Sequence, residues 1–118
     1  MSHSDIQKIN STEVMSAVTV FNQVVYLSGQ VPKNPDLDIE GQTRDILATI
    51  EQLLALANSD KSRLLSVQLF LKDLADFPKV NTIYVDWLKD SVAPSRATIQ
   101  ADLVNPKWLI EIAVIAAQ

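Results

Sequence analysis

The run of ten residues at 108–117 constrains the fold more than any other segment of the sequence. The run has strand character, and Glu111 is its only polar residue. A strand that is apolar on both sides is typical of a sheet interior, where both faces are covered. We therefore predict a strand at 108–117 whose two faces are both buried.

The remaining pattern alternates between strand and helix periods, which predicts an α+β fold. We expect six strands and two helices in the order β-β-β-α-β-α-β-β, as one domain over 1–118. The sheet is expected to be mixed and mainly antiparallel, with both helices on one face. The other predicted strands are 5–10, 17–21, 24–29, 65–71 and 96–103, with a turn at Asn22 and Gln23; the helices are 39–57, capped by Asp38, and 77–90, with Asp76 as N-cap.

The last two strands are predicted to pair with each other as a hairpin, with Leu103 opposite Trp108. Residues that pair directly point to the same face. This register places Arg96 and Thr98 on the same face as Glu111, with Arg96 roughly 13 Å from Glu111 along the strands. The opposite face is expected to lie under the helices and to carry Ala97, Ile99, Ala101, Leu103, Trp108, Ile110, Ile112 and Val114.

Two helices cover only one face of such a sheet, and the uncovered face still carries Leu109, Ala113 and Ile115. An exposed apolar sheet face marks an interface, and a second copy of the same chain is the simplest partner. We predict a homo-oligomer with a small-molecule site in the cleft between subunits.

Composition excludes several classes of function. The sequence has no cysteine, a single histidine (His3, in a predicted loose N-terminus) and only two glycines. Thiolate chemistry, a Ser-His-Asp triad, a multi-histidine metal site and the glycine-rich phosphate loops are therefore excluded. A net charge of −4 without a basic run argues against nucleic acid as a partner. The absence of a leader pattern and of a long apolar run argues against a membrane role and predicts a cytoplasmic protein.

Four local strings identify a family. The segment VVYLSGQVP at 24–32 resembles a strand and S-G-Q loop of the reactive intermediate deaminase (RidA, or YjgF) family, and KDLADF at 72–77 with Val-Asn at 80–81 resembles its next conserved segment. PSR at 94–96 resembles the family's P-x-R motif, and IEI at 110–112 resembles its I-E-I strand. Glu111 follows Arg96 by fifteen residues, which is the spacing that the family keeps between the two motifs. The resemblance covers nearly the whole chain.

The resemblance implies a fold like that of a small chorismate mutase, assembled as a homotrimer with sites between subunits. It implies hydrolysis of 2-imino and enamino acids, such as 2-aminoacrylate, to 2-oxo acids and ammonia. Arg96 would bind the substrate carboxylate, as guanidinium groups do with planar carboxylates, and Glu111 would orient or activate water. Ser28, Gly29, Asn81 and Thr98 would line the pocket, and no metal or organic cofactor is required.

Three departures from the family archetype resemble the YoaB-type branch. Met15 stands where archetypal members have a tyrosine, Thr98 stands where they often have a cysteine, and the segment between Asn81 and Arg96 is two residues shorter. The physiological substrate of this branch therefore stays open.

Other interpretations of the same residues remain. An arginine at a strand start is often only solvated, Ser28 and Gly29 can simply end a strand, Asn81 can be a solvated helix residue, and Glu111 can be a structural carboxylate. At the level of function, the alternatives are a trimeric protein that binds 2-oxo acids without turning them over and, with less support from the charge, a ribonuclease.

Overall fold

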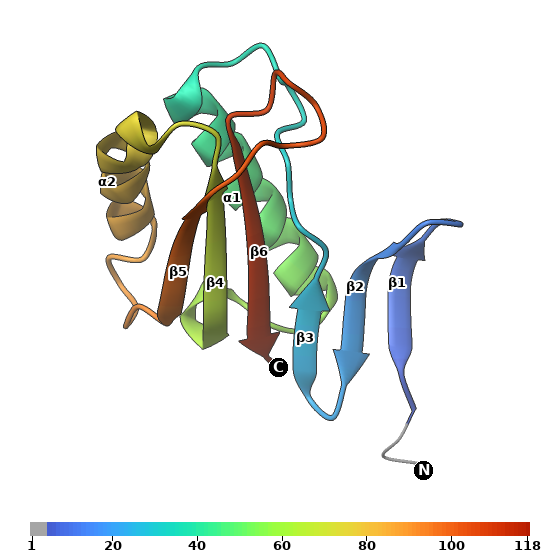
Figure 1. The fold of residues 1–118 in the computed structure, drawn as a ribbon. Helices are drawn as coiled ribbons and strands as arrows, with labels where there is room; N and C mark the ends of the chain where they lie inside the picture. The colour runs from blue at the N-terminus through green and yellow to red at the C-terminus, as the bar shows by residue number, and fades with distance from the viewer. Residues whose placement is uncertain (1–4) are drawn as a thin grey trace.

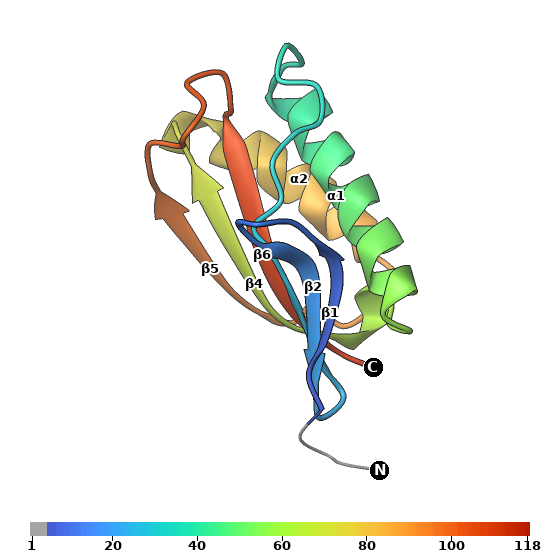
Figure 2. The same cartoon turned by 90° about the vertical axis from the view of Figure 1, so that its right-hand side faces the viewer.

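The computed structural model describes residues 5–118, so the prediction for His3 lies outside the described residues. It contains a six-stranded sheet in the order β1-β2-β3-β6-β4-β5, with two helices. Figure 2 shows both helices on one side of the sheet, as the sequence predicted. The elements are β1 (Gln7–Ser11), β2 (Ser16–Phe21), β3 (Val24–Leu27), α1 (Ile39–Leu56), a 3-10 turn (Lys61–Arg63), β4 (Leu64–Leu71), a second 3-10 turn (Leu74–Asp76), α2 (Phe77–Trp87), β5 (Ser95–Gln100) and β6 (Ile110–Ala117).

The local signals of the chain are mostly confirmed. Asn22 and Gln23 both have positive φ (51° and 66°), the backbone that a two-residue turn between twisted strands requires, and Phe21 pairs with Val24 across it. The Asp38 side chain accepts a hydrogen bond from the Gly41 amide and caps α1. At the start of α2 the prediction fails in part. Asp76 occupies the N-cap position, but its side chain makes no capping bond because it already lies in a helical 3-10 turn.

The predicted hairpin between the last two strands is wrong. β6 lies between β3 and β4 and is antiparallel to both, whereas β5 pairs in parallel with β4 at the edge of the sheet (Figure 1). The apolar β6 gains two neighbours in this arrangement, and the more polar β5 takes the edge, where polar strands are favoured. Parallel pairing needs a crossover helix, and α2 provides it between β4 and β5.

The core fills the space between the sheet and the two helices. Its side chains come from every second residue of the central strands and from one stripe of each helix. The largest fully buried apolar side chains are Val18, Val25, Ile46, Ile50, Leu54, Val67, Leu69, Leu71, Val80, Ile110 and Ile112.

Two polar residues of α1, Gln42 and Thr43, have no exposed surface. The Thr43 hydroxyl donates to the Ile39 carbonyl of the same helix, whereas the partners of Gln42 lie outside the helix. The Gln42 amide nitrogen donates to the carbonyls of Pro35, Leu37 and Lys107, and its amide oxygen accepts from the Leu109 amide. Gln42 therefore ties the loop before α1 to the loop before β6.

Within residues 5–118, no helix lies over the second face of the sheet. Tyr26 and Ile99 lie on this face and are 43% and 44% exposed. A hollow of about 240 Å³ lies between Tyr26, Ser66, Gln68, Ala113 and Ile115. The predicted uncovered face therefore exists, and it is partly apolar.

Candidate active site

Arg96 lies at the start of the edge strand β5 and points toward α2. It pairs with Val67, whose side chain is buried under the helices, so the two side chains share that face. Its Nη1 donates a 2.8 Å hydrogen bond to Oδ1 of Asn81. Its guanidinium carbon lies 5.5 Å from the ring centre of Phe77 and 5.0 Å from that of Tyr84. Three residues of α2 therefore surround Arg96 with neutral groups.

The charge of Arg96 is not neutralised within the described chain. The ion pairs of residues 5–118 involve Arg44, Lys61 and Lys107 instead. A guanidinium has five N–H donors, and only Nη1 is engaged by a side chain, while the residue itself is exposed. Burial raises the pKa of the Tyr84 phenol, against a smaller lowering by the Arg96 charge, so Tyr84 stays neutral. The arrangement leaves donors available for a ligand carboxylate.

Glu111 lies on the other face of the sheet. It pairs with Phe70 of β4 in the middle of β6 and is half-buried. Gly29 lies directly against it, because a Cβ built on Gly29 would stand 2.1 Å from Oε2 of Glu111. Reciprocal backbone hydrogen bonds of 2.8 and 3.0 Å between Gln30 and Ile112 hold the two segments together. The carboxylate therefore needs a residue without a side chain at position 29.

Ser28 and Thr98 lie at separate places in the sheet. The Ser28 hydroxyl donates to the carbonyl of Ser16 at 2.5 Å, so it fixes the end of β3 to β2. Thr98 pairs with the buried Leu69 and lies on the helix face, two residues after Arg96.

The six predicted residues thus form two groups rather than one. Arg96, Asn81 and Thr98 lie on the helix side of the sheet edge, and Glu111 and Gly29 lie on the uncovered side, with Ser28 next to Gly29. The expectation that Arg96 and Glu111 share a face is wrong. The predicted face of Ala97 and Ile99 is wrong for the same reason, since both lie on the uncovered side, whereas that of Ile110, Ile112 and Val114 is correct.

Sequence reasoning missed Phe77 and Tyr84. Tyr84 is 4% exposed and belongs to the hydrophobic core, so its place in α2 is that of a core residue. The available signal was the crossover, because a β-α-β unit brings the start of its second strand close to the helix between them.

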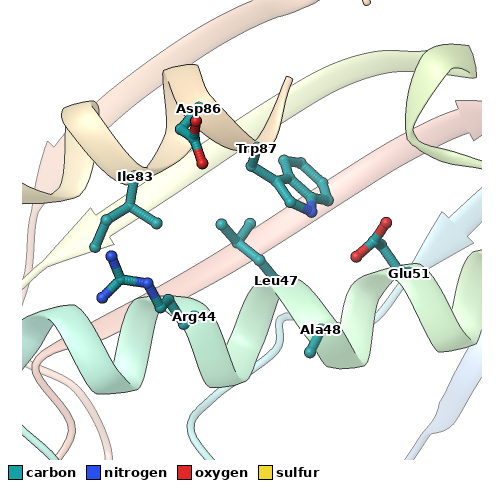
Figure 3. A pocket seen from close by; sticks show the side chains of 7 residues that line it. All are labelled: Arg44, Leu47, Ala48, Glu51, Ile83, Asp86 and Trp87. Atoms are coloured by element: carbon teal, nitrogen blue, oxygen red, sulfur yellow. The ribbon is translucent and has the colours of Figure 1, made fainter. Parts of the chain in front are cut away.

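A further pocket lies between the outer sides of the helices and contains none of the six residues. Its volume is about 170 Å³. In Figure 3, Arg44 and Glu51 of α1 lie opposite Asp86 and Trp87 of α2. Residues 5–118 hold no group of three or more metal-ligating side chains of the His, Cys, Asp or Glu type. In the same part of the chain, no helix has both the length and the apolar character to cross a membrane.

Comparison with solved structures defines the class of fold. The chain superimposes on NMB1025 of Neisseria meningitidis, described as a member of the YjgF protein family, with a TM-score of 0.95 and 33% identity, over 99% of this chain and 98% of that one. The six-stranded sheet with two helices is therefore the YjgF fold, as the resemblance predicted.

Sequence comparison gives the family. A family model described as Endoribonuclease L-PSP matches residues 6–118. The RutC family protein YoaB of Escherichia coli K12 is 38% identical over 95% of this chain and 97% of its own length. The 3-aminoacrylate deaminase RutC of Acinetobacter baylyi is 36% identical over 83% of this chain and 82% of its own. The chain belongs to the RidA/YjgF family.

Proposed function

We propose that the protein hydrolyses 2-imino and enamino acids, such as 2-aminoacrylate, to 2-oxo acids and ammonia. The observation that carries the proposal is the Arg96 guanidinium, which is exposed, held by neutral groups and free of any ion pair within residues 5–118. Such a group is suited to a planar carboxylate. Family membership and the likeness to a 3-aminoacrylate deaminase support the reaction class.

The site is composite, with Arg96 from one subunit and Glu111 from its neighbour. Within one chain the two side chains lie on opposite faces of the sheet, so they do not meet around one substrate there. The uncovered face, which carries Tyr26, Ile99 and Glu111, is the surface for a second copy. We propose a homotrimer, in which each cleft pairs the Arg96 side of one subunit with the Glu111 side of the next.

The proposed reaction needs two things from the protein: a group that positions the substrate carboxylate and a general base. An enamine is first protonated at carbon to give the imine, and the protonated imine accepts the oxygen of a water at carbon 2. Glu111 takes one proton from that water and passes it to the nitrogen. When the C–N bond breaks, ammonia leaves, Glu111 takes the remaining hydroxyl proton, and the carbonyl forms; that proton then leaves with the ammonia as ammonium. Arg96 fixes the carboxylate, and thus the attacked carbon, in reach of the water. No metal or organic cofactor takes part.

The first test couples the protein to an excess of serine or threonine dehydratase, so that imine hydrolysis limits the appearance of 2-oxo acid. We expect the wild-type protein to accelerate this step, and Arg96→Ala and Glu111→Gln not to. Both variants should keep their circular dichroism spectrum and oligomeric state, since neither side chain builds the core. A parallel assay with 3-aminoacrylate asks whether the substrate class extends to that of the RutC relative.

Subunit mixing tests the composite site. Arg96→Ala and Glu111→Gln are unfolded together and refolded at equal amounts, so that subunits assort randomly. If each site takes Arg96 from one subunit and Glu111 from the next, about one quarter of the sites regain both residues, because symmetry repeats the same contact at every interface. If both residues of a site come from one chain, no activity returns.

The second candidate is a trimer that binds 2-oxo acids through Arg96 without turnover. It is favoured by the separation of Arg96 from Glu111, because the Arg96 group contains no general base of its own. Binding of 2-oxobutanoate that is lost in Arg96→Ala, together with no acceleration of imine hydrolysis, would establish this function instead. Ribonuclease activity has no support in the charge of −4 or in the neutral surroundings of Arg96.

A further inference from the structure

The surroundings of Arg96 form a platform made of neutral groups, which we define as the rings of Phe77 and Tyr84. The two ring centres lie 5.5 and 5.0 Å from the guanidinium carbon, both within the range of a cation–π contact. The third partner, Asn81, accepts a hydrogen bond at one end of the group, Nη1. The guanidinium thus lies over two aromatic rings and is held at one nitrogen by a hydrogen bond.

This platform differs in its effect from the usual partner of an arginine. A carboxylate partner would occupy donors and cancel the charge that a ligand carboxylate has to find. The rings attract the cation through their faces and occupy none of its N–H donors. The N–H donors that do not bond to Asn81 therefore stay available to a ligand, and the positive charge of the guanidinium is not cancelled.

Tyr84 has a second property that fits this role. Its side chain is 4% exposed, and its hydroxyl is buried without a hydrogen-bond partner among the described residues. Burying a hydroxyl without a hydrogen-bond partner destabilises the folded state. The Tyr84 hydroxyl therefore adds nothing to this role, and a phenylalanine at position 84 should fill it equally well. What Tyr84 supplies is the face of its ring, and that face lies under Arg96.

We propose that Phe77 and Tyr84 are positioning residues of the carboxylate site, which hold the Arg96 guanidinium in one orientation without neutralising it. The inference rests on the proposed function in taking Arg96 as the carboxylate ligand. Neither ring is assigned to the substrate itself; both act through Arg96.

The first experiment observes the platform without any ligand. The side-chain Nε–Hε resonance of Arg96, assigned by its loss in Arg96→Lys, is followed by NMR in the wild type, Tyr84→Phe and Tyr84→Leu. We expect a ring-current shift and slow guanidinium rotation in the wild type and in Tyr84→Phe, and a loss of both in Tyr84→Leu. Free rotation in the wild type would overturn the proposal.

The second experiment separates positioning from general packing. Loss of one cation–π partner should raise the KM for the imino acid in Tyr84→Leu by roughly two- to thirtyfold with kcat unchanged, and Tyr84→Phe should restore it. Leu88→Val, a substitution at the buried C-cap of α2, is the matched control; Leu88 is not among the hydrogen-bond or cation–π partners of Arg96, and its substitution should leave KM unchanged. Equal KM values in Tyr84→Leu and the wild type would refute the role.

The two failures are distinguishable. If the wild type accelerates no imine hydrolysis, the proposed reaction fails, and titration with 2-oxobutanoate replaces KM as the readout. Weaker binding in Tyr84→Leu than in Tyr84→Phe then still supports the platform. The same affinity in both variants, or no binding to the wild type, overturns it.

Discussion

Replacing Gly29 by alanine should separate catalysis from stability. A Cβ at position 29 would stand 2.1 Å from Oε2 of Glu111 and 3.0 Å from its Cδ. The carboxylate oxygen must retreat by about 1.3 Å to reach 3.4 Å, the start of ordinary contact. The backbone itself permits alanine, because Gly29 has no positive φ. The obstacle is the far end of a flexible side chain, so the fold can give way at little cost.

We expect Gly29→Ala to lower kcat about a hundredfold in the dehydratase-coupled assay, since a displacement of about 1 Å at a reacting group costs that much. Its free energy of unfolding in urea should change by less than about 1 kcal/mol. The control is the dissociation constant for 2-oxobutanoate, which depends on Arg96 rather than on Glu111 and should stay unchanged in Gly29→Ala. Wild-type kcat in Gly29→Ala, or a loss of 2-oxobutanoate binding as large as the loss in kcat, would refute the link between Gly29 and the carboxylate.

Three further predictions concern stability. Gln42→Leu should destabilise by about 4 kcal/mol in urea unfolding, because four backbone groups lose the buried side chain to which they are hydrogen-bonded; a loss below about 1 kcal/mol would contradict this. Trp87→Phe should change stability by less than about 1 kcal/mol, because the buried Nε1 has no partner within residues 5–118 and removing it offsets the lost ring volume. Asp60 has a pKa lowered from 3.8, chiefly by hydrogen bonds from the Ser62 hydroxyl and amide, so its contribution is present at neutral pH and lost on acidification below about 3.8. Asp60→Asn should therefore show a flatter loss of stability in that acid range, measured by urea unfolding at stepped pH.

Local sequence patterns predict the helices and strands of this fold, but they do not predict which strand lies next to β5. The stripe of Ile46, Ile50 and Leu54 repeats at helical spacing and is buried as the pattern predicts. The alternation along β5 fixes which residues share a face, but the face itself depends on the neighbouring strand. The sequence analysis pairs β5 with β6, whereas the structure pairs it with β4. With the predicted neighbour and register, every side chain of β5 is placed on the wrong face of the sheet.

The candidate site divides in the same way. The family resemblance supplied Arg96 and Glu111, but their placement on opposite faces followed only from the parallel β4–β5 ladder. Gln42 was beyond sequence reasoning for a related reason. Two of its partners lie 65 and 67 residues further along the chain, so nothing near it in the sequence indicates why an amide is buried there.

The central position of β6 has a consequence for biosynthesis. Ribosomes make a chain from its N-terminus, and β6 is the last strand described, yet it is the strand that joins β3 to β4. Until it is made, β1–β3 and β4–β5 are two separate ladders, each with an open edge, and the two helices have only part of the surface against which they pack. The nascent chain therefore exposes apolar surface until translation has passed β6, the interval in which chaperones have most to protect.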